Sequence, residues 1–398
     1  MSLKLHVFNP TPDRERTDYV VTDWLPIYER AQIGPEELVV RDSAGNILPA
    51  QVDRVDPDDP SRDLLIFELK NPLPPGDEHY QTPSDYVKIE RGRPDEVGPA
   101  GDLQVHVEEE GDVETGFKLL NGRLEVWFKL IPEPWKDGRG WFAGSAYSVQ
   151  LDRKELLDAF PMSWWGHDPE KRCMQVDYIE MSRPGWEPEP MQRFDLFTQQ
   201  YRIVPGTISR GPVRASITIA SQPFRYDFHD PFTGERHDLT CELFRTITIP
   251  RRVNFAQEDM FIKARRAGTE PGPGEVSLYF SAHYFSYMQM GMKRSIFHLP
   301  TVPDWFAISS PWEPYQGYGF ATNAHATPVL NPHPDCAHFP EEIAYRTFSW
   351  STMPHTNISA LHLFWYRAPW EPKPKHTESQ TGHAWYEFVF KPLIARVL

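Results

Sequence analysis

The sequence has few cysteines, no long apolar run and no excess of basic residues. Cys173, Cys241 and Cys336 are its three cysteines in 398 residues, and their wide spacing argues against a disulfide framework. No run approaches the roughly 18 apolar residues of a membrane-spanning helix. The net charge of −15, from 56 acidic and 41 basic residues, argues against capture of nucleic acid or an anionic membrane. We therefore expect neither nucleic acid nor a membrane as a partner.

Several familiar local signals are also missing. The N-terminus has no basic stretch followed by an apolar run and a small-residue cleavage site, so we expect a cytoplasmic protein. A leader that had been removed would leave the same N-terminus. The sequence has no phosphate-binding loop, no dinucleotide fingerprint and no serine nucleophile elbow. The absence of these motifs leaves the cofactor unknown.

Proline, in contrast, is abundant, and its 40 residues are about twice the ordinary usage. Proline breaks helix interiors and is excluded from central strands, so its frequency favours short strands separated by fixed turns. Hydrophobic residues make up 40% of the chain and aromatic residues 13%, which is enough for a substantial core. The composition therefore predicts an all-β fold.

Strand and turn signals divide the chain into three parts. Residues 1–80 alternate short β runs with turn residues, which predicts a small N-terminal β-sandwich domain. Residues 81–116 are polar and rich in glycine, proline and acidic residues, and we expect a linker or a long loop. Residues 117–398 open with two apolar runs around Asn121 and Gly122, a tight-turn pair. We expect them to form one large antiparallel β-supersandwich.

Five segments resemble, in the same order, the C-terminal region of glycoside hydrolase family 38, the α-mannosidase family. The segments are Val7–Pro10, Val39–Val52, Leu120–Val126, Gly211–Ala215 and Arg346–His355. Each motif is short, and the resemblance rests on their order along most of the chain. It implies a galactose-mutarotase-like supersandwich preceded by a small β domain.

The resemblance does not extend to the catalytic half of that family. In the family, an α/β barrel that precedes the β region carries the zinc and the carboxylate nucleophile. An H-x-D-x-G-W motif at the end of a strand marks this barrel, and the motif is missing from this sequence. No catalytic residue of the family can therefore be transferred to this chain. The resemblance implies the β half of a mannosidase-like enzyme, with a separate catalytic domain or a second copy of the chain as its protein partner.

Residues 281–298 contain a cluster of histidine and tyrosine. Its candidate catalytic residues are His283, Tyr284, Arg294 and His298, and Tyr287 is a candidate substrate contact. On a strand, His283 and Tyr287 share one face and Tyr284 takes the other. A histidine and a tyrosine near an arginine are suited to proton abstraction from a uronate, whose carboxylate the arginine would neutralise. The alternative is an aromatic strand half-buried in the sandwich.

A second cluster combines tryptophans with carboxylates. Trp164, Trp165 and Trp186 are candidate platforms for a sugar ring, since indole offers a flat apolar face and one hydrogen-bond donor. Asp168 and Glu180 are the candidate acid and base, provided that their carboxyl groups lie about 5–10 Å apart. An irregular surface loop without a ligand explains the same composition equally well.

Two polar loops contain potential metal ligands. In the first, His333, Asp335 and His338 lie beside Cys336, and these side chains suit zinc or a similar metal. Their spacing matches no specific zinc pattern, and a plain surface loop is the alternative. The second loop, residues 228–238, has histidines and carboxylates suited to a cation or a sugar, or simply to solvent.

Three functions follow from these observations. The first is a carbohydrate-processing protein that binds a glycan and supports a glycosidase, as the family resemblance implies. The second is a stand-alone polysaccharide lyase or glycoside hydrolase that uses the histidine, tyrosine and carboxylate residues. The third is a non-catalytic carbohydrate-binding module. Each of them predicts a carbohydrate ligand or substrate.

Overall fold

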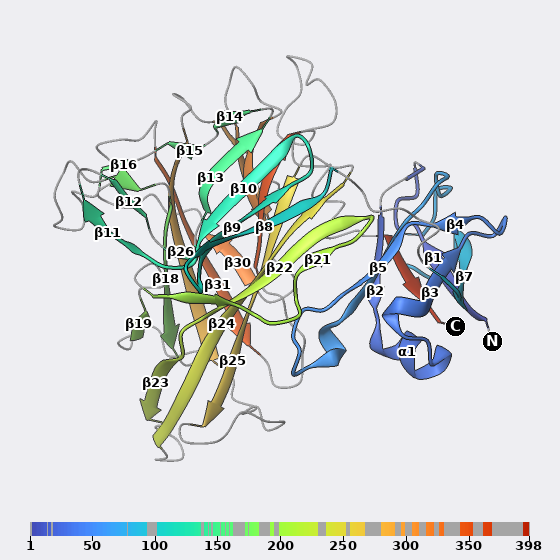
Figure 1. The fold of residues 1–398 in the computed structure, drawn as a ribbon, viewed down its shortest axis with the longest axis horizontal. Coiled ribbons are helices and arrows are strands. Elements are labelled where there is room, and N and C mark those ends of the chain that lie inside the picture. The colour runs from blue at the N-terminus through green and yellow to red at the C-terminus, as the bar shows by residue number, and fades with distance from the viewer. Residues whose placement is uncertain are drawn as a thin grey trace.

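A computed structural model confirms the all-β fold and contains one short α-helix among the described residues (Figure 1). Apart from gaps of one to six residues, it describes 2–93, 102–161, 172–182, 192–194, 199–266, 280–290, 296–298, 305–309, 316–321, 326–329, 343–352, 361–367 and 393–397. From 264 to 392, and from 154 to 198, it describes the course of the backbone alone. No helix among these residues is both long and apolar enough to cross a membrane.

The small unit at one end of the molecule is an eight-stranded sheet that curls around a single core (Figure 1). Its strand order is β4-β3-β7-β1-β33-β2-β6-β5. These strands are β1 (Leu3–Phe8), β2 (Tyr19–Asp23), β3 (Leu38–Arg41), β4 (Ile47–Leu48), β5 (Ala50–Asp53), β6 (Leu64–Glu68), β7 (Asp85–Arg91) and β33 (Leu393–Arg396). Helix α1 (Leu25–Ala31) and two 3-10 turns, η1 (Pro35–Glu37) and η2 (Pro60–Arg62), connect them.

Strand β33 occupies the middle of this sheet. It pairs antiparallel with β1 and parallel with β2, so the C-terminal strand lies between two N-terminal ones. Alternate residues of the strands point inward, as the side-chain period of two requires. The core includes Leu5, Val7, Val20, Leu65, Phe67, Val87, Ile89, Leu393 and Ala395, together with Ile27 of α1. Each large apolar side chain buried there contributes about 1.5–3 kcal/mol.

The rest of the described chain forms three sheets, of five, six and ten strands, and two short two-stranded ribbons. The five-stranded sheet contains β8 (Gln104–Glu110), β9 (Val113–Leu120), β10 (Leu124–Lys129), β13 (Ala146–Leu151) and β14 (Lys154–Glu155). The six-stranded sheet contains β15 (Leu157–Asp158), β18 (Gln175–Ser182), β19 (Gln192–Phe194), β26 (Phe280–Met290), β30 (Ala326–Val329) and β31 (Ile343–Thr352). The ribbons pair β11 (Glu133–Lys136) with β12 (Arg139–Trp141) and β16 (Phe160–Pro161) with β17 (Arg172–Cys173).

The ten-stranded sheet is the largest. It contains β20 (Tyr201–Ile203), β21 (Ser209–Arg210), β22 (Arg214–Ser221), β23 (Phe224–His229), β24 (Arg236–Pro250), β25 (Phe255–Arg266), β27 (Ile296–His298), β28 (Trp305–Ser309), β29 (Gln316–Ala321) and β32 (Leu361–Arg367). All its pairings are antiparallel. Strands β22 and β24 contact β9 of the five-stranded sheet, so these two sheets pack face to face.

The alternation of buried and half-buried residues along its strands explains how the five-stranded sheet packs against the ten-stranded sheet. In β10, Leu124, Val126 and Phe128 are buried and the residues between them are half-buried. The rings of Phe117 and Phe128 stack with their centroids 5.1 Å apart and their planes 2° apart. Every second residue of these strands therefore lies on the opposite, outer face of the sheet.

Residues 81–116, which we expected as a linker or a loop, contain two whole strands and the start of β9. Residues Asp85–Arg91 form β7 of the small unit, and Gln104–Glu110 form β8 of the five-stranded sheet. In β8, Val105 is buried, whereas Gln104 and His106 are exposed. The polar composition of this segment thus reflects the solvent-facing residues of β7 and of the edge strand β8 as well as loops.

Buried polar groups join the small unit to the ten-stranded sheet. The Gln51 side chain accepts hydrogen bonds from the backbone N–H groups of Val213 (2.9 Å) and Arg214 (3.0 Å) and donates to the Arg214 carbonyl (3.0 Å). The guanidinium of Arg214 donates from Nε to Oδ2 of Asp53 at 2.5 Å. A second ion pair links Lys263 of β25 to Asp56, which is 1% exposed. The two units therefore meet through specific charges rather than a flexible linker alone.

Asp63, in the same part of the small unit, has a buried carboxyl group. Burial raises the pKa of Asp63 to about 6, although a hydrogen bond from the backbone N–H of Val55 acts in the opposite direction. The folded state therefore holds a proton that the unfolded chain releases above about pH 4, so the stability that this proton contributes is lost as the pH rises from about 4 to about 6 and stays lost above that. We expect Asp63→Asn to raise the free energy of unfolding by about 1–2 kcal/mol at pH 7 and by almost nothing at pH 4. Urea titrations at both pH values check this, and an equal effect at both would contradict it.

Candidate functional site

The strand register of the six-stranded sheet brings two predicted residues together. Strand β26 pairs antiparallel with β18 on one side and β31 on the other. Glu180 is directly opposite His283, and Ser349 is opposite His283 on the far side. Directly opposed positions of an antiparallel pair have Cβ atoms about 4.5–5.5 Å apart and share a face. The sheet thus places a carboxylate position next to an imidazole position.

The same register sorts the aromatic residues of β26 between the two faces of the sheet. Tyr287 shares the face of His283, and the partner of Tyr287 in β31 is Tyr345. Tyr284 lies on the other face, opposite Ile179 and Phe348. On this sheet the tyrosine position that accompanies His283 is therefore Tyr287, not Tyr284.

The chemistry of these residue types on one face suits a polar, hydroxylated ligand. A carboxylate beside an imidazole can orient the ring and assist proton transfer to or from a bound group. Tyrosine combines a flat apolar ring with a hydroxyl that donates or accepts a hydrogen bond. The positions of Glu180, His283 and Tyr287 therefore combine an acid–base pair of residue types with an aromatic one.

The other predicted residues lie either elsewhere in the described sheets or outside the described residues. His298 lies in β27 of the ten-stranded sheet, opposite Ala307, and thus in a different sheet from His283. The candidates that lie outside the described residues are Arg294, Asp168, Trp164, Trp165, Trp186, His333, Asp335 and His338. Most of the loop at 228–238, residues 230–235, also lies outside them. Within the described part of the chain, no group of three or more His, Cys, Asp or Glu residues is placed to hold a metal ion.

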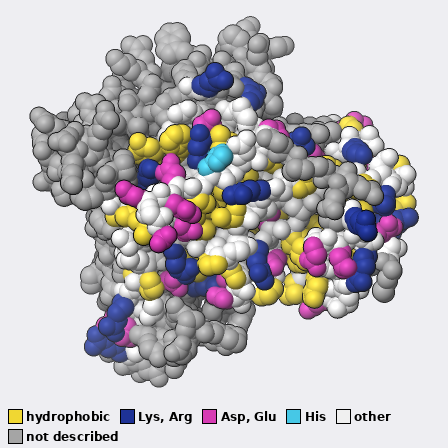
Figure 2. Space-filling view, viewed as in Figure 1, with side chains coloured by type: hydrophobic (Ala, Val, Ile, Leu, Met, Phe, Trp, Pro, Cys, Tyr) yellow, Lys and Arg dark blue, Asp and Glu magenta, His cyan; other side chains and the backbone are white. Residues whose placement is uncertain are grey.

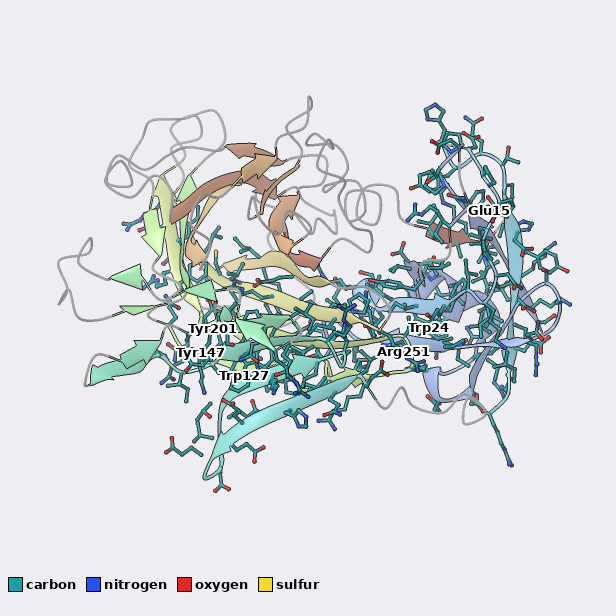
Figure 3. The ribbon with its side chains drawn as sticks, turned by 90° about the horizontal axis from the view of Figure 1, so that it is seen from above. Glu15, Trp24, Trp127, Tyr147, Tyr201 and Arg251 are labelled. Carbon is teal, nitrogen blue, oxygen red and sulfur yellow. The ribbon has the colours of Figure 1, made fainter. Side chains whose placement is uncertain are left out.

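One surface that the sequence reasoning missed lies on the outer face of the five-stranded sheet. Trp127 of β10 and Tyr147 of β13 are half-buried there, and Figure 3 shows them close together on neighbouring strands. The ammonium group of Lys118 lies 4.5 Å from the centroid of the Trp127 ring. The alternation of Trp127 with the buried Val126 and Phe128 could have revealed it.

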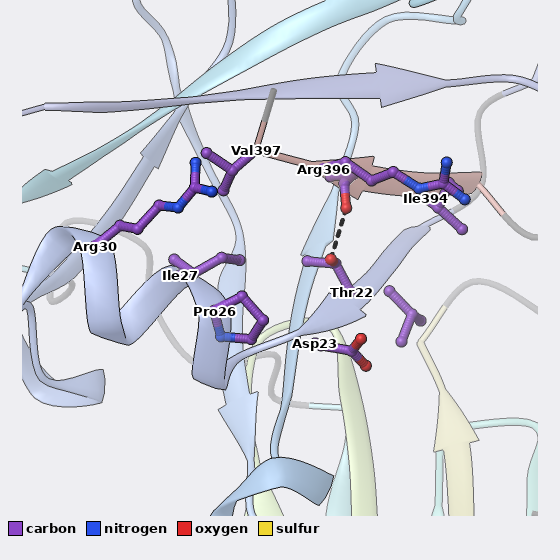
Figure 4. Close-up of a pocket in the computed structure, with 10 residues that line it drawn as sticks. Thr22, Asp23, Pro26, Ile27, Arg30, Ile394, Arg396 and Val397 are labelled. Carbon is purple, nitrogen blue, oxygen red and sulfur yellow. Dashed lines mark hydrogen bonds between the residues drawn. The ribbon is translucent and has the colours of Figure 1, made fainter. Parts of the chain in front are cut away.

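A cavity of about 420 Å³ lies within the small unit, beside α1 and between β2 and β33 (Figure 4). Its floor includes the buried Ile27 and Ala395, and Thr22 donates a hydrogen bond from its hydroxyl to the Ala395 carbonyl at 2.6 Å. Arg30 and Asp23 are exposed at its rim. All its lining residues belong to the small unit, so the cavity takes no part in the face that carries His283.

Comparison with known proteins gives structural similarity without a family assignment. No family model matches the sequence, and no curated protein matches it. A protein of glycosyl hydrolase family 38 from Enterococcus faecalis is similar with a TM-score of 0.40 and 8% identity, over 89% of this chain and 45% of that one. An α-mannosidase from Enterococcus faecalis V583 gives a TM-score of 0.43 and 9% identity, over 92% of this chain and 43% of that one.

A heparan sulfate lyase, HepC from Pedobacter heparinus, is similar with a TM-score of 0.33 and 6% identity. The alignment covers 65% of this chain and 36% of the lyase. The chain thus spans less than half the length of each of these three proteins.

Proposed function

We propose that this chain is a carbohydrate-processing protein that binds a glycan on the face of β18, β26 and β31 and supports a glycosidase. The observation that carries the proposal is the register that sets Glu180 opposite His283 with Tyr287 on the same face. The five segments that resemble the β region of family 38 point to the same substrate class. Catalysis by a separate domain fits the absence of the H-x-D-x-G-W motif from the sequence.

Each of these residues has a distinct role in the proposal. Tyr287 contacts the sugar ring, Glu180 accepts hydrogen bonds from hydroxyl groups, and His283 donates to or accepts from the same hydroxyls. Together they orient one or two sugar residues across the strands.

The second candidate is a stand-alone lyase or hydrolase, and the Glu180–His283 register favours it specifically. In a lyase, His283 would take the proton next to the uronate carboxylate and pass it to the oxygen of the leaving sugar as the C–O bond to that sugar breaks. This yields an unsaturated uronate and a free hydroxyl group without any added water. In a hydrolase, the same pair would serve as acid and base toward water and the glycosidic oxygen.

The test compares His283→Ala and Glu180→Gln with Tyr284→Phe, a matched control on the opposite face of the same strand. Binding of manno-oligosaccharides and of uronate-containing oligosaccharides is measured by calorimetry, with new reducing ends and the ultraviolet absorbance of unsaturated uronate measured in parallel. We expect the first two variants to weaken binding about tenfold or more, and the control to bind as the native chain does.

The outcomes separate the two candidates. Binding without any product supports the glycan-binding half, whereas a product that is lost in His283→Ala supports the stand-alone enzyme. Failure of the native chain to bind either kind of oligosaccharide would refute both.

A further inference from the structure

The outer face of the five-stranded sheet has side chains arranged in two similar groups. This outer sheet face comprises His106, Glu108, Lys118, Glu125, Trp127, Lys129 and Tyr147. It is the side turned away from the Phe117–Phe128 stack, as the alternation of β9 and β10 requires. Figure 2 shows acidic and basic side chains interspersed with hydrophobic ones over strands β8 to β10.

The first group is centred on Trp127. Lys118 of β9 is directly opposite Trp127, and its Nζ atom lies 4.5 Å from the centroid of the indole ring. The same Nζ lies 2.8 Å from Oε2 of Glu125. An aromatic ring, an ammonium and a carboxylate therefore meet on adjacent strands.

The second group repeats this combination around Tyr147. Lys129 of β10 has its Nζ 5.5 Å from the Tyr147 ring centroid and 2.6 Å from Oε2 of Glu108. Gly116, which lies opposite Lys129, makes this arrangement possible. A Cβ atom at Gly116 would come within 2.7 Å of Glu108 Oε2 and 3.3 Å of the Lys129 side chain. A larger residue at this position would push the ion pair apart.

A bulge brings the two groups side by side. The register between β10 and β13 shifts between Trp127, which is opposite Ser148, and Phe128, which is opposite Ala146. Tyr147 is the extra residue at this shift, and such bulges typically re-aim a side chain. Trp127 and Tyr147 consequently share one side of the sheet, each beside its own lysine and glutamate (Figure 3).

The stability of the fold gains little from the ion pairs in these two groups. The side chains of the two ion pairs are between 16% and 36% exposed, and pairs near the surface contribute only about 0.2–1 kcal/mol. Their four charges cancel, although the chain as a whole has a net charge of −15. A surface without net charge attracts neither a polyanion nor a polycation.

Such a surface complements a neutral ligand that is rich in hydroxyl groups. The aromatic rings offer flat apolar area to the C–H face of a sugar, and the charged groups can hydrogen-bond to its hydroxyls more strongly than neutral groups can. Two such groups on neighbouring strands would contact successive sugars of one chain. We propose that the outer sheet face binds a neutral polysaccharide as an anchoring site, separate from the face that carries His283 and independent of the function proposed for it.

The test uses Trp127→Ala and Tyr147→Ala, with Tyr28→Ala as the matched control. Tyr28 is a 42% exposed aromatic residue on α1 of the small unit. Retardation in native gels that contain α-mannan, cellulose derivatives or xylan gives the affinity for neutral polysaccharides, and heparin and chitosan serve as charged probes. Circular dichroism verifies that each variant is folded. If Trp127→Ala does not fold, Tyr147→Ala still tests the proposal.

At least one neutral polysaccharide should retard the native chain and the control equally, and Trp127→Ala and Tyr147→Ala should reduce its affinity about tenfold. The retardation should persist in about 0.5 M salt, where exposed charges are largely screened. The proposal fails if no neutral polysaccharide binds, if only the charged probes bind, or if both folded variants bind as the native chain does. Oligosaccharide binding that requires His283 should be unchanged in Trp127→Ala, so failure of one site does not imply failure of the other.

Discussion

Asp53→Ala is expected to lower the free energy of unfolding by about 3–5 kcal/mol, because it leaves the guanidinium of Arg214 buried without its carboxylate. The side chains of Asp53 and Arg214 are 1% and 6% exposed, and Nε of Arg214 lies 2.5 Å from Oδ2 of Asp53. The hydroxyl of Ser216 donates to the same carboxylate oxygen at 3.2 Å. Burial disfavours the charged form of Arg214, and the neighbouring carboxylate of Asp53 outweighs it and raises the pKa of Arg214. Arginine stays charged at any ordinary pH, so its charge remains when the partner is removed.

Guanidinium chloride unfolding of a double-mutant cycle measures this effect. Arg214→Met alone should also destabilise, whereas Asp53→Ala combined with Arg214→Met should recover part of the loss, because no isolated charge remains buried. Glu90→Ala is the control, since its partner Arg41 forms a pair with 3.0 Å separation whose side chains are 34% and 35% exposed. The control should cost less than about 1 kcal/mol. Equal losses of unfolding free energy in Asp53→Ala and Glu90→Ala would show that the buried ion pair contributes no more to stability than an exposed one.

A second large loss is expected within the ten-stranded sheet, where Arg245→Met should also cost about 3–5 kcal/mol. Arg245 of β24 forms an ion pair with Glu258 of β25, and their side chains are 0% and 3% exposed. Removal of the arginine leaves the Glu258 carboxylate, whose side chain is 3% exposed, without this ion pair, and burial then favours the protonated form of Glu258. The cost should therefore be largest at neutral pH and become smaller as the pH falls and Glu258 takes up a proton.

This pH dependence separates loss of charge pairing from loss of packing. Arg245→Met and the double variant Arg245→Met with Glu258→Gln are compared by urea unfolding at pH 5 and pH 8. The single variant should lose more stability at the higher pH, and the double variant should lose a similar amount at both. A single variant whose loss does not vary with pH would show that Arg245 stabilises the sheet mainly through the packing of its alkyl chain.

Local sequence pattern was enough to predict much of the fold. The dipeptide Asn121-Gly122 predicts a tight turn, and Gly122 has a φ of +85°, which glycine adopts without strain. Strand β10 follows the alternation of Leu124, Val126 and Phe128, and the shared face of His283 and Tyr287 follows from the same period of two. Strands β7 and β8 were missed because their outward-facing residues are polar, and strands with one solvent-facing side look like polar loops.

The candidate sites needed information that no local pattern contains. Glu180 and His283 are about a hundred positions apart, and a slip of one residue in the pairing of β18 with β26 would place them on opposite faces. That register depends on how both strands pack in the whole sheet. The outer sheet face likewise depends on the bulge at Trp127 and on the space above Gly116, both of which are properties of neighbouring strands.

The position of β33 has a consequence for the order in which the molecule is built. Pairing of His6 with Arg396 completes the middle of the small unit, so strands β1 and β2 must wait for the last strand of the described chain. At roughly 5–20 residues per second, a ribosome needs on the order of 20–80 s to synthesise the intervening chain. During that interval the edges of β1 and β2 are open to pairing with other chains. Chaperone binding to the nascent chain, and its misfolding, should therefore be concentrated at β1 and β2. In the folded protein these strands are among the most deeply buried parts.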